Sequence, residues 1–312
     1  MDNFLYCFDS NYNKQGFCSI ISLLNNSQST KDIYIIHQDP DSFNKFSKII
    51  IEHKNLNNLN IYKFNEENIS FPNLENKHVS EATYYRLFMN KYLPKDIDYI
   101  FYIDADAFCL QDPTEVVEAT FQQLKEGGYF IGAKTEHTEK DLEFERIKKL
   151  GIDSKYFNAG VMFVDYEKSL NYQLFQKLRV KLNEIQNLIE FWDQDVLNSF
   201  FNGDFYEINA NLNFDSNKLD LKKNIITKNI IFLHFKGSKK PWTIDGIFNT
   251  SSIFYTKLYQ KYNLGSYHIT TRWRKDLLIK FLKSITSFKI FQLKNPIKFS
   301  YSVLSVLVKN NE

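Results

Sequence analysis

The chain has 312 residues, of which 43% are hydrophobic and 24% are charged, and its formal net charge is +2. This composition indicates a globular protein with one large core or one core plus an appendage, and it excludes a disordered chain; no stretch reaches the roughly 20 apolar residues of a membrane-spanning helix. The start, MDNFLYCFDSN, lacks the regions of a signal peptide, and three cysteines lie singly in apolar stretches, so we expect buried free thiols in a cytoplasmic protein.

Short apolar segments alternate with longer segments of helix-like spacing through most of the chain. Runs rich in β-branched and aromatic residues predict strands at 4–8, 32–37, 59–64, 99–103, 129–133, 158–164 and 230–235. Helices are expected between them, at 14–27, 41–54, 81–92, 114–126, 138–150, 167–187 and 193–201. This alternation predicts an α/β fold with a largely parallel sheet that is buried on both faces.

The segment YIFYIDADAFCL, residues 99–110, places two aspartates at the end of a predicted strand. Residues two apart in a strand point to the same side, so Asp104 and Asp106 aim together at the edge where open α/β sheets bind ligands. Converging carboxylates repel unless a cation lies between them, which favours Mg²⁺ or Mn²⁺ bridging to a substrate phosphate. The alternative is a turn that caps the next helix, since QDP at 111–113 is turn chemistry.

Two later segments carry polar residues beside an apolar run. In YFNAGVMFVD, residues 156–165, Asn158 offers an amide and Gly160 lets a ligand or another strand approach closely. In FWDQDVLN, residues 191–198, Asp193 opens a predicted helix. Taken alone, these segments favour turn and cap roles, with Asp193 as an N-cap.

A third segment, IIFLHFKGSKKPW at 230–242, ends a predicted strand with His234 and continues into a glycine-containing basic loop. Imidazole suits Mn²⁺, and Lys236, Lys239 and Lys240 suit a phosphate as point charges. By itself, a histidine at a strand end is often a core or cap residue. Together with the two aspartates, however, these residues predict a site for a metal-bound diphosphate.

The C-terminal region is strongly basic. From Arg272 to Lys298 there are eight Lys or Arg and one acid, so this window carries +7 and the rest of the chain −5. Drawn as one helix, residues 272–291 place Trp273 and the phenylalanines mostly on one face and lysines mostly on the other, as in helices that lie on anionic membranes. The alternative is a helix packed on the protein's own core with a solvated basic face. Nucleic acid binding is disfavoured, because aromatic and basic residues do not interleave.

In their order and spacing, DAD (104–106), FNAGV (157–161), DQDVLN (193–198) and HFKGSKKPW (234–242) resemble the motifs of glycosyltransferase family 8. This family comprises retaining enzymes that use nucleotide sugars, and the chain is most similar to its bacterial lipopolysaccharide α-1,4-galactosyltransferases and glucosyltransferases. The resemblance implies a GT-A fold, a Rossmann-like α/β domain with a mixed, mostly parallel sheet flanked by helices, over residues 1–245. Residues 246–312 would form a basic helical extension, attached peripherally to the inner face of the cytoplasmic membrane.

The resemblance also implies the roles of single residues. Asp104, Asp106 and His234 would hold Mn²⁺ or Mg²⁺ on the diphosphate of UDP-galactose or UDP-glucose. Thr83 would line the cleft, and further contacts to this donor are implied for Asp9, Asn11, Tyr12, Val79, Arg86, Ala105, Asn158, Ala159, Asp193, Gln194, Gly237 and Lys240. The saccharide acceptor, a lipid-linked oligosaccharide, would contact His78 and Glu136.

The implied catalytic residues are Gln194, Asp193 and Asp195. Gln194 would lie nearest the anomeric carbon of the donor, where a retaining glycosidase has a carboxylate nucleophile. Because an amide is a poor nucleophile, we expect the acceptor hydroxyl to attack from the side that UDP leaves. Asp193 would then bind a sugar hydroxyl, and Asp195 would be structural or would stabilise positive charge.

The sequence departs from its relatives at three positions. Ala105 stands where bulkier aliphatic residues are usual, Glu136 where an acceptor-binding Asp is common, and Cys7 where a small residue adjoins the base. These departures affect the identity of the acceptor more than the donor chemistry. A glycogenin-like self-glucosylating enzyme is an alternative, given 19 tyrosines. A second alternative is a membrane-associated nucleotide-sugar-binding protein without activity, but the presence of Asp104, Asp106, His234 and Lys240 together argues against it.

Overall fold

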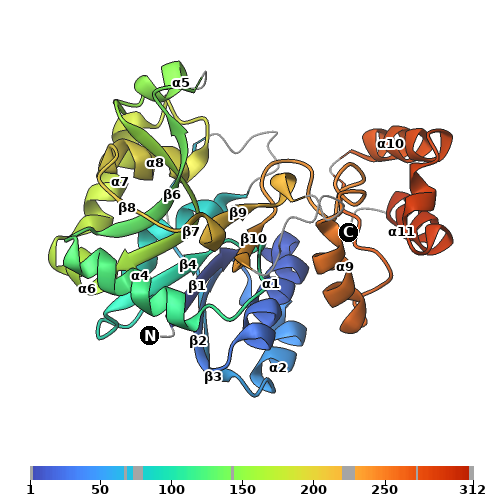
Figure 1. Cartoon of the computed structure of the whole chain (residues 1–312), viewed down its shortest axis with the longest axis horizontal. Helices are drawn as coiled ribbons and strands as arrows, with labels where there is room; N and C mark the ends of the chain where they lie inside the picture. The colour runs from blue at the N-terminus through green and yellow to red at the C-terminus, as the bar shows by residue number, and fades with distance from the viewer. Residues whose placement is uncertain are drawn as a thin grey trace.

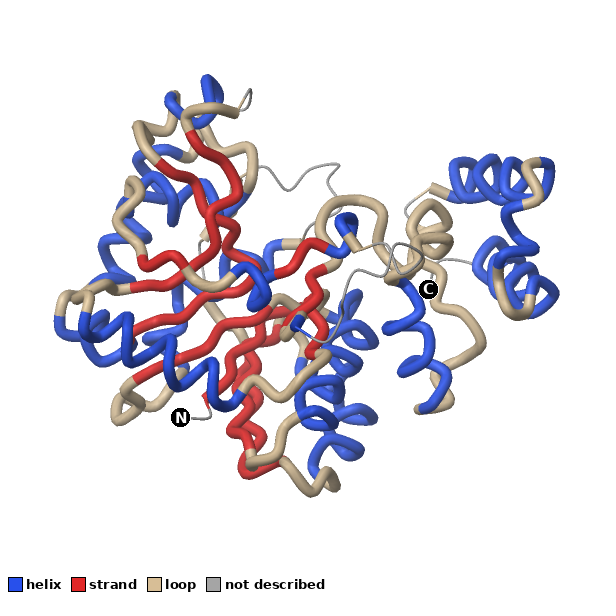
Figure 2. Tube along the Cα trace, in the orientation of Figure 1, coloured by secondary structure: helices blue, strands red, loops and turns tan. Residues whose placement is uncertain are grey.

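A computed structural model describes residues 3–66, 69–72, 80–141, 144–219, 229–271 and 273–308. Within these residues the central element is a seven-stranded sheet of order β3-β2-β1-β4-β7-β6-β8 (Figure 2). Its strands are β1 (Asn3–Phe8), β2 (Lys31–His37), β3 (Leu56–Lys63), β4 (Tyr99–Ile103), β6 (Ile131–Thr138), β7 (Lys155–Asp165) and β8 (Tyr206–Glu207). Neighbouring strands are parallel except that β7 runs antiparallel to both β4 and β6. The mixed, mostly parallel sheet is therefore confirmed.

A smaller sheet joins two of the motifs that lie far apart in the sequence. It has the order β5-β10-β9, with β5 (Ala107–Cys109), β10 (Phe232–His234) and β9 (Phe214–Asp215). Strand β10 pairs antiparallel with β5, which sets His234 opposite Ala107. It also pairs in parallel with β9, which sets His234 opposite Asp215. This pairing carries the histidine to the aspartates that precede β5.

Helices flank the central sheet (Figure 1). The α-helices are α1 (Asn13–Asn26), α2 (Asn44–Ile51), α3 (Met89–Tyr92), α4 (Thr114–Glu126), α5 (Phe144–Lys148), α6 (Tyr166–Asn171), α7 (Leu174–Ile185), α8 (Trp192–Phe201), α9 (Ser252–Lys261), α10 (Arg274–Thr286) and α11 (Pro296–Val308). The 3₁₀ segments are η1 (Ser10–Tyr12), η2 (Pro40–Phe43), η3 (Glu81–Phe88), η4 (Ala210–Asn213), η5 (Ser216–Lys218) and η8 (Lys289–Gln292). All seven predicted strands appear in this fold, as β1, β2, β3, β4, β6, β7 and β10.

Four predicted helices differ from the structure, and the one at 41–54 is the end of η2 followed by α2, which stops at Ile51. The segment at 81–92 is mostly the 3₁₀ segment η3, and only its last turn is α-helical. The segment at 167–187 is two helices, because Gln173 has a left-handed backbone with φ of 58°. In the described part of the segment at 138–150, Thr138 still belongs to strand β6 and the helix is the short α5.

Each face of the central sheet packs against its own hydrophobic core. Along β1, Phe4, Tyr6 and Phe8 face one core, and Leu5 and Cys7 face the other, which is the period of two of a strand. The first core includes side chains of α1, α2, α4 and α9, and the second includes those of η3, α7 and α8. Burial of both faces explains why the strand sequences are nearly continuous in apolar residues.

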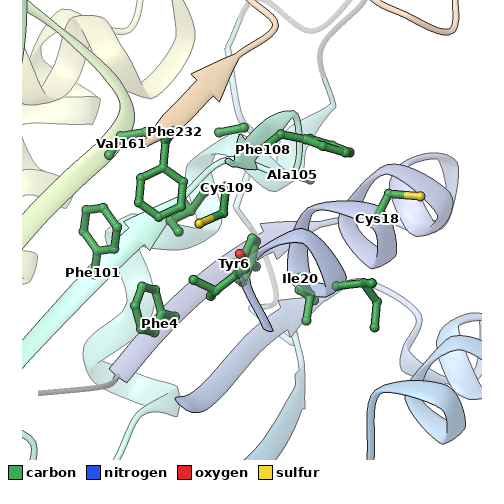
Figure 3. Close-up of a cluster of buried hydrophobic side chains, with 14 of the residues drawn as sticks. Phe4, Tyr6, Cys18, Ile20, Phe101, Ala105, Phe108, Cys109, Val161 and Phe232 are labelled. Carbon is green, nitrogen blue, oxygen red and sulfur yellow. The ribbon is translucent and has the colours of Figure 1, made fainter. Parts of the chain in front are cut away.

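The first core also fixes the small sheet against the large one. Figure 3 shows Phe101 of β4 and Val161 of β7 beside Phe232 of β10. The ring centroids of Phe101 and Phe232 lie 5.3 Å apart. Since His234 ends the same strand as Phe232, this packing holds the histidine at the end of β4 and beside Gly160 in the middle of β7.

The C-terminal region has a third hydrophobic core, to which α10, η8 and α11 contribute and which includes Leu277, Phe281 and Phe299. The prediction of one helix over 272–291 was wrong at its end: α10 stops at Thr286, and Phe288 has a left-handed backbone with φ of 58°. Helix α11, which was not predicted, packs beside α10 at the end of the molecule farthest from α5 and α6 (Figure 1). Among the described residues no helix is both long and apolar enough to cross a membrane.

Candidate functional site

A cleft opens where β1 and β4 end, and most of the residues singled out in the sequence line it. Those that line it are Cys7, Tyr12, Thr83, Arg86, Asp104, Ala105, Asp106, Glu136, Asn158, Gly160, Asp193, Gln194, His234, Lys236, Gly237 and Lys240. Asp9, Asn11, Ala159 and Asp195 lie beside the cleft and do not line it. The positions of His78 and Val79 are outside the described residues.

Three ligand-type side chains converge in this cleft. Asp104 follows β4, Asp106 precedes β5 and His234 ends β10. The Nε2 atom of His234 lies 3.2 Å from Oδ1 of Asp106 and 4.0 Å from Oδ2 of Asp104. One ligand atom from each residue can be chosen so that all three lie within 4.8 Å of one another, close enough to share a single metal ion.

The surroundings of this trio fit a cation. Oδ1 of Asp106 is buried, and its nearest polar contact is Nε2 of His234 at 3.2 Å. The backbone of Gly160 closes the site from β7, and a Cβ atom there would lie 2.2 Å from Cε1 of His234 and 2.8 Å from Oδ2 of Asp104. Two carboxylates and one imidazole form a donor set that suits Mn²⁺. We conclude that these residues could hold a divalent metal ion.

Lys240 lies behind Asp106. Its ammonium group pairs with Oδ2 of Asp106 and donates to the carbonyl oxygen of Phe235 at 2.9 Å. Burial opposes the charge of Asp106, but Lys240 and His234 outweigh it and hold the pKa of Asp106 below its usual range. Burial likewise opposes the charge of Lys240, and Asp106 raises its pKa above the usual value. The pair therefore stays charged at neutral pH.

A second buried ion pair connects the metal trio with helix α8. Nε of Arg86, in η3, lies 2.6 Å from Oδ2 of Asp193, and Nη1 lies 3.6 Å from Oδ1 of Asp104. The guanidinium stacks over the ring of Tyr102 at 4.1 Å, and it also donates to the carbonyl oxygen of Ala159. Burial raises the pKa of Asp193 to about 7, although Arg86 opposes this shift. Asp193 lies in the first turn of α8, so the N-cap prediction was wrong.

Gln194 is held by hydrogen bonds from both ends of its amide. Its Oε1 accepts from the backbone N–H of Ala159 at 3.0 Å, and its Nε2 donates to Oε2 of Glu136 at 3.3 Å and to the Tyr156 hydroxyl at 3.2 Å. Lys236 forms an ion pair with the same glutamate at 3.0 Å. The amide is therefore fixed at the cleft wall, as a neutral group that cannot easily act as a nucleophile.

Asp195 is completely buried beneath the cleft. It accepts a hydrogen bond from Tyr156 at 2.6 Å, and it accepts from the backbone N–H groups of Glu190 and Phe191, both at 2.8 Å. The carboxylate thus holds the chain that enters α8. Of the two roles expected for Asp195, structural support and stabilisation of positive charge, this placement fits the structural one.

The segment after β1 forms the opposite end of the site. The carboxylate of Asp9 caps η1 by accepting from the backbone and side-chain amides of Asn11, at 3.0 and 3.3 Å. Tyr12 lines the cleft and packs edge-on against Trp242 with ring centroids 6.1 Å apart. Gly237 has φ of 71° and open space around it, so its loop can bring backbone close to a ligand.

Two residues that contact the metal trio were not singled out in the sequence. Tyr102 donates to Oδ1 of Asp104 at 2.6 Å, and its position two residues earlier in the same strand was a usable signal. Asn213 lies 2.9 Å from Nδ1 of His234. No local pattern could reveal this contact, because it depends on how η4 and β10 meet in the fold.

Comparisons with known proteins agree with this geometry. The model of the family described as glycosyl transferase family 8 matches residues 3–246. A lipopolysaccharide 1,2-glucosyltransferase of Escherichia coli K12 is 28% identical over 254 residues, which are 77% of this chain and 72% of that protein. The general stress protein A of Bacillus subtilis is 25% identical over 257 residues, covering 76% of this chain and 85% of that protein.

Solved structures share the fold. The galactosyltransferase LgtC, solved in complex with donor and acceptor sugar analogs, superposes with a TM-score of 0.68 at 21% identity. The match covers 84% of this chain and 96% of that one. The glycosyltransferase GlyE of Streptococcus pneumoniae gives a TM-score of 0.57 at 18% identity, over 88% of this chain and 66% of that one. The expected GT-A fold is therefore confirmed.

Proposed function

Because the chain belongs to glycosyltransferase family 8 and is a retaining, metal-dependent enzyme of that family, we propose that it moves a hexose from UDP-galactose or UDP-glucose to a saccharide acceptor. The acceptor would be a lipid-linked oligosaccharide of lipopolysaccharide, lipooligosaccharide or a related surface glycan, and the new bond would be α-linked. The observation that carries this proposal is the convergence of Asp104, Asp106 and His234 beside two buried cations, Arg86 and Lys240. Carboxylates, imidazole and positive charge in one cleft suit a nucleotide diphosphate.

Asp104, Asp106 and His234 would hold Mn²⁺ or Mg²⁺, which when bound neutralises charge on the departing UDP. Arg86 and Lys240 add fixed positive charge near the same point, and such preorganised charge stabilises a developing anion. Gly237 leaves space for the phosphates to approach the backbone. Asp9, Asn11 and Tyr12 would contact the nucleoside.

Gln194 would stand beside the anomeric carbon, where a covalent nucleophile would be needed, and its hydrogen bonds fix its orientation. An amide does not form a glycosyl ester as a carboxylate does. We therefore expect the acceptor oxygen to bond to the anomeric carbon on the face from which UDP departs. The acceptor proton would pass to the leaving phosphate oxygen. Asp193 would accept a hydrogen bond from a donor hydroxyl, and Asp195 would position α8.

Glu136 would contact the acceptor, and Lys236 would keep its ion pair with Glu136.

The experiment for this function is to incubate the enzyme, Mn²⁺ and each UDP-hexose with a truncated lipooligosaccharide and to identify the product by mass and by NMR. We expect one added hexose in α-linkage. A β-linked product would contradict the proposal. A gain of hexose on the protein itself, with none on the added acceptor, would favour the glycogenin-like alternative.

The ionisation of Asp193 predicts the pH dependence of turnover. Below its pKa of about 7 the carboxyl of Asp193 is protonated. It then lacks the negative charge that pairs with Arg86 and that would accept a hydrogen bond from a hydroxyl of the donor sugar. The value of kcat/KM for the UDP-sugar should therefore rise about tenfold per pH unit below this point and level off above it. Steady-state rates between pH 5 and 9 measure this. Asp193→Asn mimics the protonated form and should lose the inflection; an unchanged inflection would assign it to another group.

We further propose that residues 246–312 attach the catalytic domain of residues 1–245 to a membrane. Some side chains of α10 and α11 pack in the third core, but other apolar side chains on both helices stay exposed, and we call these the C-terminal apolar face. It consists of Leu278, Leu282, Ile285, Ile297, Tyr301, Leu304 and Val308. Ile297 is 81% exposed and Tyr301 75% exposed, and neighbouring lysines such as Lys283 and Lys298 complement an anionic leaflet. This attachment would hold the enzyme at the inner face of the cytoplasmic membrane.

Vesicle binding tests the C-terminal apolar face. The full chain should sediment with vesicles of anionic phospholipid, less so in high salt and hardly at all with neutral phospholipid. Replacing Leu282 and Ile297 by Ser should weaken binding at least about tenfold, since burying one large apolar side chain is worth about 1.5–3 kcal/mol. Val180→Ser, which changes an exposed residue of α7, is the matched control. Equal binding of all three proteins would contradict this role.

A further inference from the structure

A buried amide lies directly behind the metal trio. The side chain of Asn213, at the end of η4, is completely buried. Its Oδ1 lies 2.9 Å from Nδ1 of His234, and its Nδ2 donates to Oδ1 of Asn158 at 2.9 Å. Asn213 thus joins the histidine of β10 to the asparagine of β7.

The orientation of both amides follows from groups whose hydrogen-bonding roles are fixed. The backbone N–H of Gly160 can only donate, and it donates to Oδ1 of Asn158 at 3.1 Å. Nδ2 of Asn158 in turn donates to Oε2 of Glu136 at 3.1 Å. Asn213 must therefore turn its Nδ2 toward Asn158, which leaves its Oδ1 facing His234. An amide oxygen only accepts, so the histidine must carry a proton on Nδ1.

We propose that Asn213 is a positioning residue that keeps the proton of His234 on Nδ1, so that Nε2 offers its lone pair to the metal ion. This inference rests on the proposed metal site. In the opposite tautomer a lone pair on Nδ1 would face the oxygen of Asn213, and Nε2 would carry a hydrogen where the ion must bind. A hydrogen bond on the second ring nitrogen is the usual way in which proteins fix the tautomer and orientation of a metal-binding histidine.

The other two metal-site residues are held from behind in the same way. Oδ1 of Asp104 accepts from Tyr102, and Oδ2 of Asp106 pairs with Lys240. Each residue thus turns its other ligand atom toward the centre of the trio. These atoms are Oδ2 of Asp104, Oδ1 of Asp106 and Nε2 of His234. Asn213 supplies the third of these rear contacts.

The test compares Mn²⁺ affinity and the tautomer of His234 in full-length variants. Calorimetric titration of Asn213→Ala with Mn²⁺, without nucleotide, should give an affinity about 10–100-fold weaker than wild type. Asn211→Ala, in the same 3₁₀ segment, should leave it unchanged. In metal-free protein labelled with ¹⁵N-histidine, His234 should carry a proton on Nδ1 in wild type, whether or not Nε2 also donates to Asp106, and should lose this preference in Asn213→Ala. Its signals are those missing from His234→Gln.

Asn213→Asp is the control for misfolding, because it also replaces the buried amide. Its carboxylate still accepts from Nδ1, so it should keep the Nδ1–H form that Asn213→Ala loses. Wild-type Mn²⁺ affinity in Asn213→Ala, or an Nε2–H form of His234 in wild type, would overturn the role of Asn213. If wild type itself binds no Mn²⁺, the metal site fails, and with it both this inference and the proposed function.

Discussion

Asp106→Asn is expected to lower kcat about a thousandfold, a loss of about 4 kcal/mol of transition-state stabilisation. The substitution keeps the shape of the side chain but removes a negative charge that faces the metal position. Oδ1 of Asp106 is buried and unpaired apart from its 3.2 Å contact with Nε2 of His234, so a bound cation would be its main partner. Rates with saturating Mn²⁺ and UDP-hexose measure the effect.

The same substitution affects folding, and a second variant separates the two effects. Asp106→Asn leaves the ammonium of Lys240 buried without its anionic partner, which typically costs about 3–5 kcal/mol of stability. The double variant Asp106→Asn with Lys240→Met removes both charges, so it should recover much of the stability but none of the activity. Recovery of turnover together with stability would show that the single variant fails by misfolding.

Gly160→Ala is expected to weaken Mn²⁺ binding about 10–100-fold, although it changes no ligand. The added Cβ would lie 2.2 Å from Cε1 of His234 and 2.8 Å from Oδ2 of Asp104, so at least one of them must move. The imidazole has little freedom to do so, because it is buried and bonded to Asn213. Titration with Mn²⁺ and a thermal melt of the metal-free protein measure affinity and stability separately.

Gly132→Ala is the matched control for this variant. It adds a Cβ in the adjacent strand β6, where the nearest atoms are the side-chain ends of Leu124 and Ile208 at 3.1 and 3.2 Å. It should lower stability by crowding the core and leave Mn²⁺ affinity unchanged. If Gly160→Ala binds Mn²⁺ as wild type does, the ion does not lie where the trio converges.

The fold and the metal trio could be predicted because local patterns carry them. The apolar run of β4 ends at Ile103, and the two aspartates follow at once, so their place at the sheet edge was readable. Helix α4 starts and ends at the predicted residues, Thr114 and Glu126. The position of His234 at the end of a strand could also be predicted. Its approach to the aspartates could not, because it depends on the pairing of β10 with β5, which spans only three residues on each strand.

The remaining features depend on contacts or backbone conformations without a periodic signal. Asn213 meets His234 only because a 3₁₀ segment packs on a short strand. The C-terminal helix was predicted too long because its apolar spacing continues through Phe288, whose left-handed backbone ends it. Periodicity describes which face is apolar, but it does not reveal where a chain turns.

Release of UDP from a panel of UDP-sugars, with Mn²⁺ and after EDTA, tests the proposed activity most directly. We expect slow hydrolysis of one hexose donor, either UDP-galactose or UDP-glucose, that stops on adding EDTA and returns when Mn²⁺ is restored. Loss of this hydrolysis in Asp106→Asn would assign it to the trio. Hydrolysis that persists at the same rate in EDTA, or in that variant, would contradict a metal-dependent transfer centred on Asp104, Asp106 and His234.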